Sequence, residues 1–191
     1  MDNQGAFKII AISGHKRSGK DVLADHFVSK YNYTKIKMAD KLKQVLKLLF
    51  DFTDDQLESD IKETIDLSWM ITPRKAMQFF GTEIMQEKIQ ELLPNIGRKF
   101  WVTNLINQIK NNNKNKYVIS DLRFYHEYEE LLKLAGDNLY VIRITRKSCI
   151  NEQSQHISEL EYMTIPSTIN IENTGSIEEL LIKLDNSMTC N

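Results

Sequence analysis

An apolar run that ends in a glycine-rich loop is the feature that most constrains how this chain folds. Residues 7–13 read FKIIAIS, which is typical of a strand buried on both faces of a parallel sheet. The loop GHKRSGKD follows at 14–21, and apolar side chains then recur at helical spacing as far as residue 31. A strand, a glycine loop and a helix in this order predict a parallel sheet with helices packed on it.

The rest of the chain repeats the two patterns, with one interruption. Short apolar runs that predict further strands lie at 33–38, 117–120, 138–145 and 168–173. Helical spacing recurs at 41–50, 126–136 and 176–188. Residues 51–98 contain no convincing strand; Thr72 and Pro73 there are typical of a helix cap and first helical residue, and predict a long helix ending near Leu93, with another over 98–112. We therefore expect one α/β domain, a doubly wound parallel sheet with a helical insertion.

The composition excludes several classes of protein. Apolar residues make up 41% and charged residues 27% of the chain, as in ordinary folded globular proteins. The net charge of −1 provides no broad basic field for a nucleic-acid polymer. No run reaches the roughly 20 apolar residues of a membrane span, and Cys149 and Cys190 suggest neither a disulfide framework nor a zinc site. We expect a cytoplasmic protein whose partners are small molecules; the sequence leaves open whether it forms a homodimer.

The loop at 14–21 has the spacing of a phosphate-binding motif. It fits G-x-x-x-x-G-K, with Asp21 where Ser or Thr usually follows the lysine. Gly14 and Gly19 let the backbone curl, so that N–H groups around Ser18 and the helix N-terminus point at phosphate oxygens. Lys20 then reaches the β- and γ-phosphates. We expect ATP here, together with Mg²⁺.

Charged residues around the loop supply the other candidates for this site. Arg17 is favoured as a cation that neutralises the transferring phosphate, while Lys16 is also explained as a solvated loop residue. Asp21 can bind Mg²⁺ directly or through water, lie near the acceptor, or be only a first-turn anion. Asp121 ends the buried run YVIS, beside Arg123, at the edge where open α/β sheets place ligands. We interpret Asp121 as a second metal ligand, with a helix N-cap as its alternative.

Five motifs together resemble the deoxynucleoside monophosphate kinase family of large bacteriophages and related viruses. They are GHKRSGKD, TPRKAMQFFGTE, RKFWV, ISDLR followed by HE, and HISE. The resemblance runs from about Lys8 to Leu184 but is weak between Phe50 and Thr72. It implies a P-loop NTPase three-layer sandwich, within a single domain over 1–191, in host cytoplasm if the chain is viral. The parts it implies are a core at 7–50 and 116–188, a helical acceptor-binding lobe at about 51–115 and a lid at about 146–166.

The resemblance also assigns residues to the acceptor. Arg74 in TPRKAMQFFGTE and Arg98 in GRKFWV match the family's contacts to the acceptor phosphate, a role that suits the planar guanidinium fork. Arg123 joins them. Of four aromatic residues that are mainly core candidates (Phe79, Phe80, Phe100 and Trp101), we assign Phe80 and Trp101 to the acceptor site, although the sequence does not choose which ring stacks on a base.

The lid and the last strand contribute the remaining candidates. Arg146 opens a polar stretch that resembles a lid closing over ATP phosphates, and Lys147 assists it. His156 and Glu159 match the family's HISE motif, with capping or packing as an equal alternative. Asn173 and Gly175 follow the last strand, where this fold type often lines the adenine; a plain turn explains them equally well.

The expected reaction is transfer of the ATP γ-phosphate to a deoxynucleoside monophosphate, with Lys20, Arg17, Asp121 and Arg146 as the catalytic residues. Two alternatives stay open. The Asp after the loop lysine also occurs in animal phosphomevalonate kinases, so another small phosphate can be the acceptor. A nucleotide-binding regulatory switch or adaptor would bind nucleotide without phosphorylating an acceptor.

Overall fold

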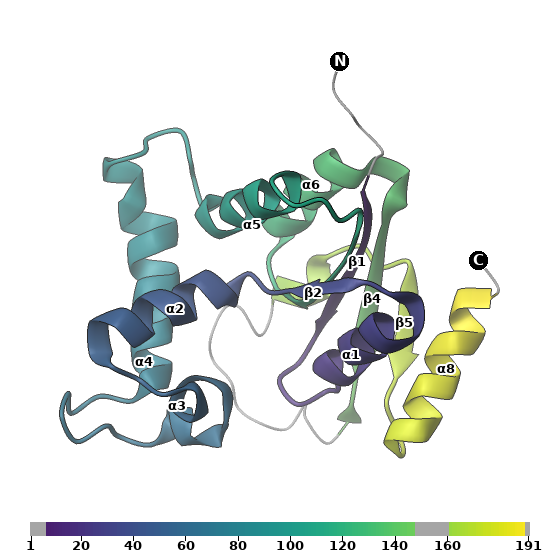
Figure 1. Ribbon diagram of the computed structural model, residues 1–191, viewed down its shortest axis with the longest axis horizontal. Helices are drawn as coiled ribbons and strands as arrows, with labels where there is room; N and C mark the ends of the chain where they lie inside the picture. The colour runs from purple at the N-terminus through teal and green to yellow at the C-terminus, as the bar shows by residue number, and fades with distance from the viewer. Residues whose placement is uncertain (1–6, 148–160, 190–191) are drawn as a thin grey trace. The chain divides into compact units, whose positions relative to one another are not determined.

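The computed structural model describes residues 7–147 and 161–189, and its ribbon is drawn in Figure 1. Its chain divides into two compact units. One contains Met1–Lys37 and Leu105–Asn191, and we call it the sheet unit; the other is Met38–Asn104, which we call the helical unit. Each unit is described by itself. Most of the lid expected at about 146–166, including His156 and Glu159, lies outside the described residues.

The sheet unit is built on five parallel strands, as the sequence predicted. They are β1 (Lys8–Gly14), β2 (Thr34–Ile36), β3 (Lys116–Leu122), β4 (Leu139–Thr145) and β5 (Ile169–Glu172). Their order in the sheet is β2-β3-β1-β4-β5, and every pairing is parallel. The carboxyl ends of β1, β3 and β4 therefore meet at one edge, where the glycine loop begins.

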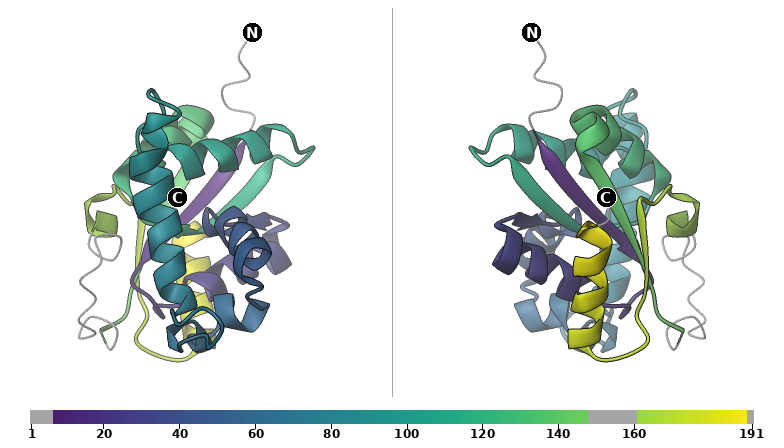
Figure 2. Two further views of the ribbon diagram at one scale, coloured as in Figure 1. Left: turned by 90° about the vertical axis from the view of Figure 1, so that its left-hand side faces the viewer. Right: turned by 90° about the vertical axis from the view of Figure 1, so that its right-hand side faces the viewer.

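Helices cover both faces of this sheet (Figures 1 and 2). Ile10 and Ile12 of β1 are fully buried in one cluster with side chains of α1 (Lys20–Tyr31) and α8 (Ile177–Thr189). Alternate strand residues point to opposite faces, so Ile9 and Ala11 face the other side, where α6 (Tyr125–Ala135) contacts β1 and β4. Helices on two faces of a parallel sheet confirm the predicted three-layer α/β architecture.

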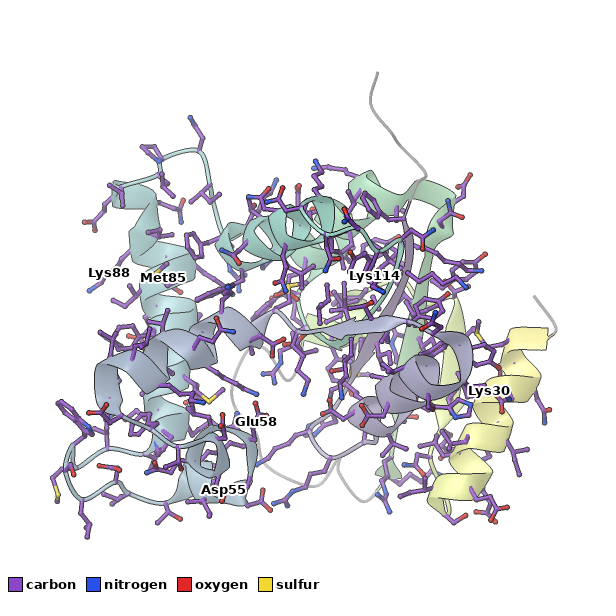
Figure 3. All side chains as sticks on the ribbon, in the orientation of Figure 1. Lys30, Asp55, Glu58, Met85, Lys88 and Lys114 are labelled. Carbon is purple, nitrogen blue, oxygen red and sulfur yellow. The ribbon has the colours of Figure 1, made fainter. Side chains whose placement is uncertain are left out.

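A partly exposed polar cluster links α8 to α1, and its Lys30 is labelled in Figure 3. Asp185 of α8 accepts hydrogen bonds from three α1 side chains, namely His26 Nε2 at 2.9 Å, Lys30 Nζ at 2.7 Å and Tyr31 Oη at 2.8 Å. Burial alone would raise the pKa of Asp185, but the bonds from Lys30, His26 and Tyr31 outweigh it and lower the pKa to about 2. The helix that begins at Lys20 is thereby fixed near its far end.

Short helices around a small aromatic core make up the helical unit. They are α2 (Ala39–Phe50), α3 (Asp54–Glu58), η1 (Asp60–Glu63), α4 (Pro73–Gln78), η2 (Phe79–Glu87), η3 (Lys88–Glu91) and the first residues of α5 (Phe100–Lys110). Leu42, Leu46, Phe52 and Trp101 are buried in its core. The expected absence of strands holds within this unit apart from one bridge, Asp66 to Ile71. Thr72 caps α4 and Pro73 is its first residue, as predicted.

The helix expected from Pro73 to Leu93 changes its winding at Phe79. Residues Phe79–Glu87 form a π-helix and Lys88–Glu91 a 3₁₀ turn. Inside the π-helical stretch the Gly81 carbonyl accepts a hydrogen bond from the Trp101 indole N–H at 2.8 Å, so a side chain competes with the helical ladder there. Periodicity in the sequence does not reveal such a tertiary donor. In the described ranges, no helix has the length and apolarity needed to cross a bilayer.

Candidate active site

Three backbone conformations shape the loop between β1 and α1. Gly14 has φ 152°, Arg17 φ 61° and Gly19 φ 111°. A side chain rarely adopts these values, and a Cβ on Gly19 would lie 3.1 Å from Asn173 Nδ2. Arg17 adopts the left-handed conformation although it is not glycine, which costs of order 1 kcal/mol and is common at ligand-binding turns. The loop is therefore tightly curled at both glycines, and phosphate binding by it stays a prediction.

Lys20 lies folded back over this loop. Its Nζ donates to the carbonyl of Gly14 at 2.8 Å and to the carbonyl of His15 at 2.7 Å. Both carbonyl oxygens belong to the loop that precedes α1, so the ammonium group lies against this loop at the helix start. A phosphate entering here would find the cation in place and would compete with two carbonyls for it.

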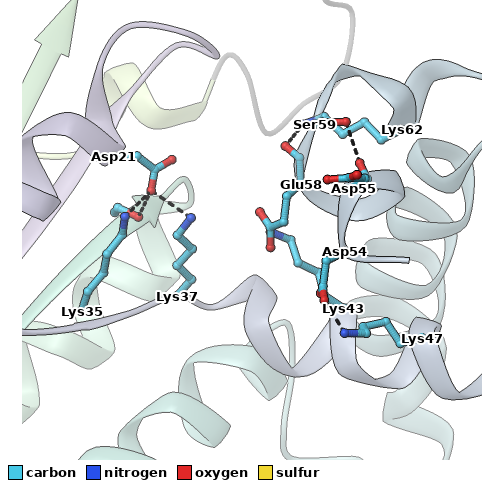
Figure 4. A network of polar contacts seen from close by, with 11 residues as sticks. Asp21, Lys35, Lys37, Lys43, Lys47, Asp54, Asp55, Glu58, Ser59 and Lys62 are labelled. Atoms are coloured by element: carbon cyan, nitrogen blue, oxygen red, sulfur yellow. Dashed lines mark hydrogen bonds and ion pairs between the residues drawn. The ribbon is translucent and has the colours of Figure 1, made fainter. Parts of the chain in front are cut away.

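Asp21 is held by two lysines that sequence reasoning missed (Figure 4). Its Oδ1 lies 2.9 Å from Lys35 Nζ and 2.8 Å from Lys37 Nζ, and accepts a hydrogen bond from Ser120 Oγ at 3.1 Å. Burial alone would raise the pKa of Asp21, but the bonds from Lys37 and Lys35 hold it well below its usual range. The carboxylate is therefore ionised at neutral pH. Lys35 lies in the short strand β2 and Lys37 directly follows this strand, so their spacing of two residues could have indicated a shared face.

Asp121 lies beside an irregularity in the pairing of β3 with β1. The register passes from Ala11 opposite Ile119 to Ser13 opposite Leu122, so β3 has one residue more than β1 in this interval. Such a bulge re-aims side chains and is common next to active sites. Asp121 is inside the strand rather than at the cap of α6, whose N-cap is Phe124. The helix-cap alternative for Asp121 is therefore wrong.

Glu127 supports the chain just after Asp121. Its Oε2 accepts hydrogen bonds from the backbone N–H groups of Arg123 at 2.9 Å and Phe124 at 3.0 Å. The side chain is buried, and this burial raises its pKa to about 7, with the charge of Asp121 acting in the same direction and the two backbone N–H groups opposing it. Glu127 thus fixes the backbone from which the half-buried Arg123 extends. In the sequence, the motif HE after ISDLR is the signal that points to Glu127.

The remaining candidates of the sheet unit differ in exposure. Arg17 and Arg146 are exposed, and Ser18 is fully buried in the loop. Asn173 is buried and donates from Nδ2 to the Ser18 carbonyl at 2.9 Å. Gly175 lies two residues before α8, and a Cβ added to it would collide with the carboxylate of Glu179.

The helical unit contains both predicted acceptor arginines, and each is held through its Nε. Arg74 Nε donates to Glu63 Oε1 at 3.1 Å, and Arg98 Nε donates to Gln86 Oε1 at 3.3 Å. Gln86 is only 3% exposed, and it lies on the π-helix. A guanidinium fixed by its Nε keeps a defined direction for the two terminal nitrogens that recognise phosphate.

The two aromatic candidates pack in the core of the same unit. Trp101 is 8% exposed and its N–H is bonded to Gly81. Phe80 is partly buried against that cluster, with its ring centroid 5.7 Å from that of Phe50. The described contacts account for both as packing residues, and stacking on a base stays a prediction.

Comparison with known proteins decides the family. The family model described as deoxynucleotide monophosphate kinase matches residues 8–66 and 49–184. The chain belongs to the deoxynucleotide monophosphate kinase family. A protein of Acanthamoeba polyphaga mimivirus named as a candidate deoxynucleotide monophosphate kinase is 31% identical over 182 residues, covering 90% of this chain and 91% of its own. The deoxynucleotide monophosphate kinase of Enterobacteria phage T4 is 23% identical over 251 aligned positions, covering 95% and 98%.

Membership of the deoxynucleotide monophosphate kinase family confirms the resemblance seen in the motifs. Solved structures are more distant. A gluconokinase from Sinorhizobium meliloti 1021 superposes with a TM-score of 0.49 at 10% identity, over 98% of this chain and 94% of its own. A dephospho-CoA kinase from Campylobacter jejuni gives 0.47 at 15% identity, over 95% and 96%. Similarity at this level says nothing of the substrate of this family member.

Proposed function

We propose that the protein transfers the γ-phosphate of ATP to a deoxynucleoside monophosphate, giving ADP and the deoxynucleoside diphosphate. The observation that carries this proposal is the loop at the end of β1, with its left-handed turns and with Lys20 Nζ on the Gly14 and His15 carbonyls, in a chain of this kinase family. The ATP phosphates would lie against the N–H groups of this loop and of the first turn of α1.

Charge stabilisation in the sheet unit is assigned to cations around the loop. Lys20 meets the β- and γ-phosphates, and Arg17 and Arg146, both exposed, supply further positive charge. The backbone of Gly14, Lys16, Ser18 and Gly19 forms the phosphate cradle. Asn173 and Gly175 complete the nucleotide side of the assignment.

Asp21 and Asp121 fit a magnesium site by their chemistry. Carboxylate oxygens are the ligands that Mg²⁺ prefers, and the metal usually keeps waters and phosphate oxygens as its other ligands. The ionised state of Asp21 and the use of only its Oδ1 by Lys35, Lys37 and Ser120 leave Oδ2 as a possible ligand. When bound, Mg²⁺ would neutralise the charge of the terminal phosphates.

Arg74 and Arg98 of the helical unit are assigned to the acceptor phosphate, with Arg123 of the sheet unit as a third candidate. Phe80 and Trp101 remain the candidates for contact with the base. The acceptor phosphate is a nucleophile near neutral pH, so catalysis requires positioning and charge stabilisation rather than a strong general base. A covalent enzyme intermediate is not needed.

A panel of acceptors tests the proposal. Purified protein is incubated with Mg-ATP and, separately, with each deoxynucleoside monophosphate, the ribonucleotide counterparts and phosphomevalonate, and diphosphate products are separated by chromatography. We expect deoxynucleoside diphosphates. Phosphorylation of phosphomevalonate alone would assign the chain to the other kinase, and ATP binding without any phosphorylated acceptor would favour a regulatory switch.

A further inference from the structure

Asn173, at the end of the edge strand β5, contacts the phosphate-binding loop. It directly follows β5, and its backbone N–H donates to the Thr145 carbonyl at the end of β4 at 2.8 Å. Its side-chain Nδ2 donates to the Ser18 carbonyl at 2.9 Å, and the residue is 7% exposed. We propose that Asn173 is a positioning residue that sets the conformation of the phosphate-binding loop for nucleotide binding, an inference that rests on the function proposed above.

Because the peptide bond is planar, the bond from Asn173 to the Ser18 carbonyl also orients the N–H of Gly19. The Ser18 carbonyl and the Gly19 N–H belong to one trans peptide unit, so they point in opposite directions. By holding the Ser18 oxygen, the Asn173 amide turns the Gly19 N–H away from itself. Gly19 is the N-cap of α1, and the N–H groups at a helix start are those that meet an anion. One side-chain bond therefore orients a backbone donor that the polyphosphate needs.

Close packing keeps this arrangement in place. A Cβ on Gly19 would lie 3.1 Å from Asn173 Nδ2 and 3.1 Å from Leu180 Cδ2, so Gly19 fits against the Asn173 amide and α8. Gly19 also needs its φ of 111°. The observed conformation of the loop satisfies both the bond to Asn173 and the contact with α8.

The side-chain oxygen of Asn173 indicates that the Nδ2 donor is the group that matters at this position. Asn173 Oδ1 is buried and has no hydrogen-bond partner among residues 7–147 and 161–189. An unsatisfied buried acceptor destabilises a fold, and an apolar side chain of similar size would avoid that loss. Asparagine at this position is explained by the bond from Nδ2 to the loop.

Amide hydrogen exchange of the nucleotide-free protein tests the positioning role without relying on activity. Asn173→Ala removes the donor, and Asn173→Asp removes it at constant size. Asn170→Ala is the matched control, because Asn170 is exposed on the same strand and accepts from Ser167 Oγ at 2.9 Å. We expect peptides covering Gly14–Lys20 to exchange about 3- to 10-fold faster in both Asn173 variants, and unchanged in the control. Unchanged exchange in these peptides overturns the inference.

Nucleotide affinity provides the second readout. We expect the Kd for ATP to rise about 3- to 10-fold in Asn173→Ala and by more in Asn173→Asp, whose carboxylate faces the Ser18 carbonyl and the polyphosphate. The KM for the acceptor should stay within about 2-fold, a split that general destabilisation would not give. Faster exchange with an unaltered Kd would also overturn the inference. If wild-type protein binds no ATP, the proposed function fails, while the exchange comparison still decides the role of Asn173.

Discussion

Replacing Lys20 with alanine separates its role in binding ATP from its role in phosphate transfer. In the described structure Lys20 Nζ already makes two hydrogen bonds, to the Gly14 and His15 carbonyls at 2.8 and 2.7 Å. Moving onto phosphate oxygens exchanges these bonds for others, so the net gain in ATP affinity is small. We expect the Kd for ATP to rise by no more than about 10-fold in Lys20→Ala, equivalent to about 1.4 kcal/mol.

Lys20→Ala should lose more stabilisation of the transition state than of bound ATP. Charge grows on the phosphates as the γ-phosphate moves, and removing one group aimed at such charge lowers kcat by about 10² to 10³. A coupled assay of ADP release measures kcat, and calorimetry measures the Kd, with exposed Lys114→Ala as the control. The fall in kcat should be equal for every acceptor, because Lys20 is assigned to the ATP side. Retention of wild-type kcat, or a loss confined to one acceptor, would refute this reasoning.

Three further perturbations test other parts of the account. Arg74→Ala should raise the KM for the deoxynucleoside monophosphate by about 10- to 100-fold with little change in the KM for ATP, whereas exposed Lys75→Ala should change neither. Equal effects on both substrates would contradict the assignment of Arg74 to the acceptor phosphate. The pKa of Asp185 is lowered, so its contribution to the stability of the folded protein exists above the unfolded pKa and is lost as pH falls through the folded value of about 2. In urea unfolding, Asp185→Asn should be about 1 kcal/mol less stable than wild type near pH 7 and should lose less stability on acidification. The pKa of Glu127 is raised to about 7, so its contribution to the stability of the folded protein is present below its usual pKa and is lost as pH rises through 7. The stability of Glu127→Gln should therefore depend less on pH in that window, and a pH profile equal to that of wild type would argue against the buried carboxyl.

The sheet was predictable because its strands are buried on both faces. Runs such as YVIS and FKIIAIS are typical of strands buried on both faces, and each is a strand near its predicted bounds. The helical unit was less predictable. The helical spacing at 41–50 predicts an apolar face that includes Val45 and Leu49, but these two side chains of α2 are 41% and 53% exposed. Within the π-helix, Gly81 accepts a hydrogen bond from Trp101, which is 20 residues away in sequence, and local periodicity could not indicate this contact.

In the site, residue types were predictable but their partners were not. The glycine loop and Lys20 follow from spacing alone. The bonds of Asp21 to Lys35 and Lys37, the bulge beside Asp121 and the bond of Asn173 to Ser18 depend on strand register and helix placement. A single sequence carries no direct signal for such contacts. The positions of Arg74 and Arg98 came from the family resemblance, since isolated arginines are more often solvated.

Transfer of a labelled γ-phosphate tests the central claim most directly. Wild-type protein in excess is mixed with ATP that carries a radioactive γ-phosphate and with a deoxynucleoside monophosphate, and the products of a single turnover are separated. The account predicts that label appears in the deoxynucleoside diphosphate in a one-to-one ratio with ADP, and that Lys20→Ala slows this transfer. Label recovered only as inorganic phosphate or only as unreacted ATP would contradict it.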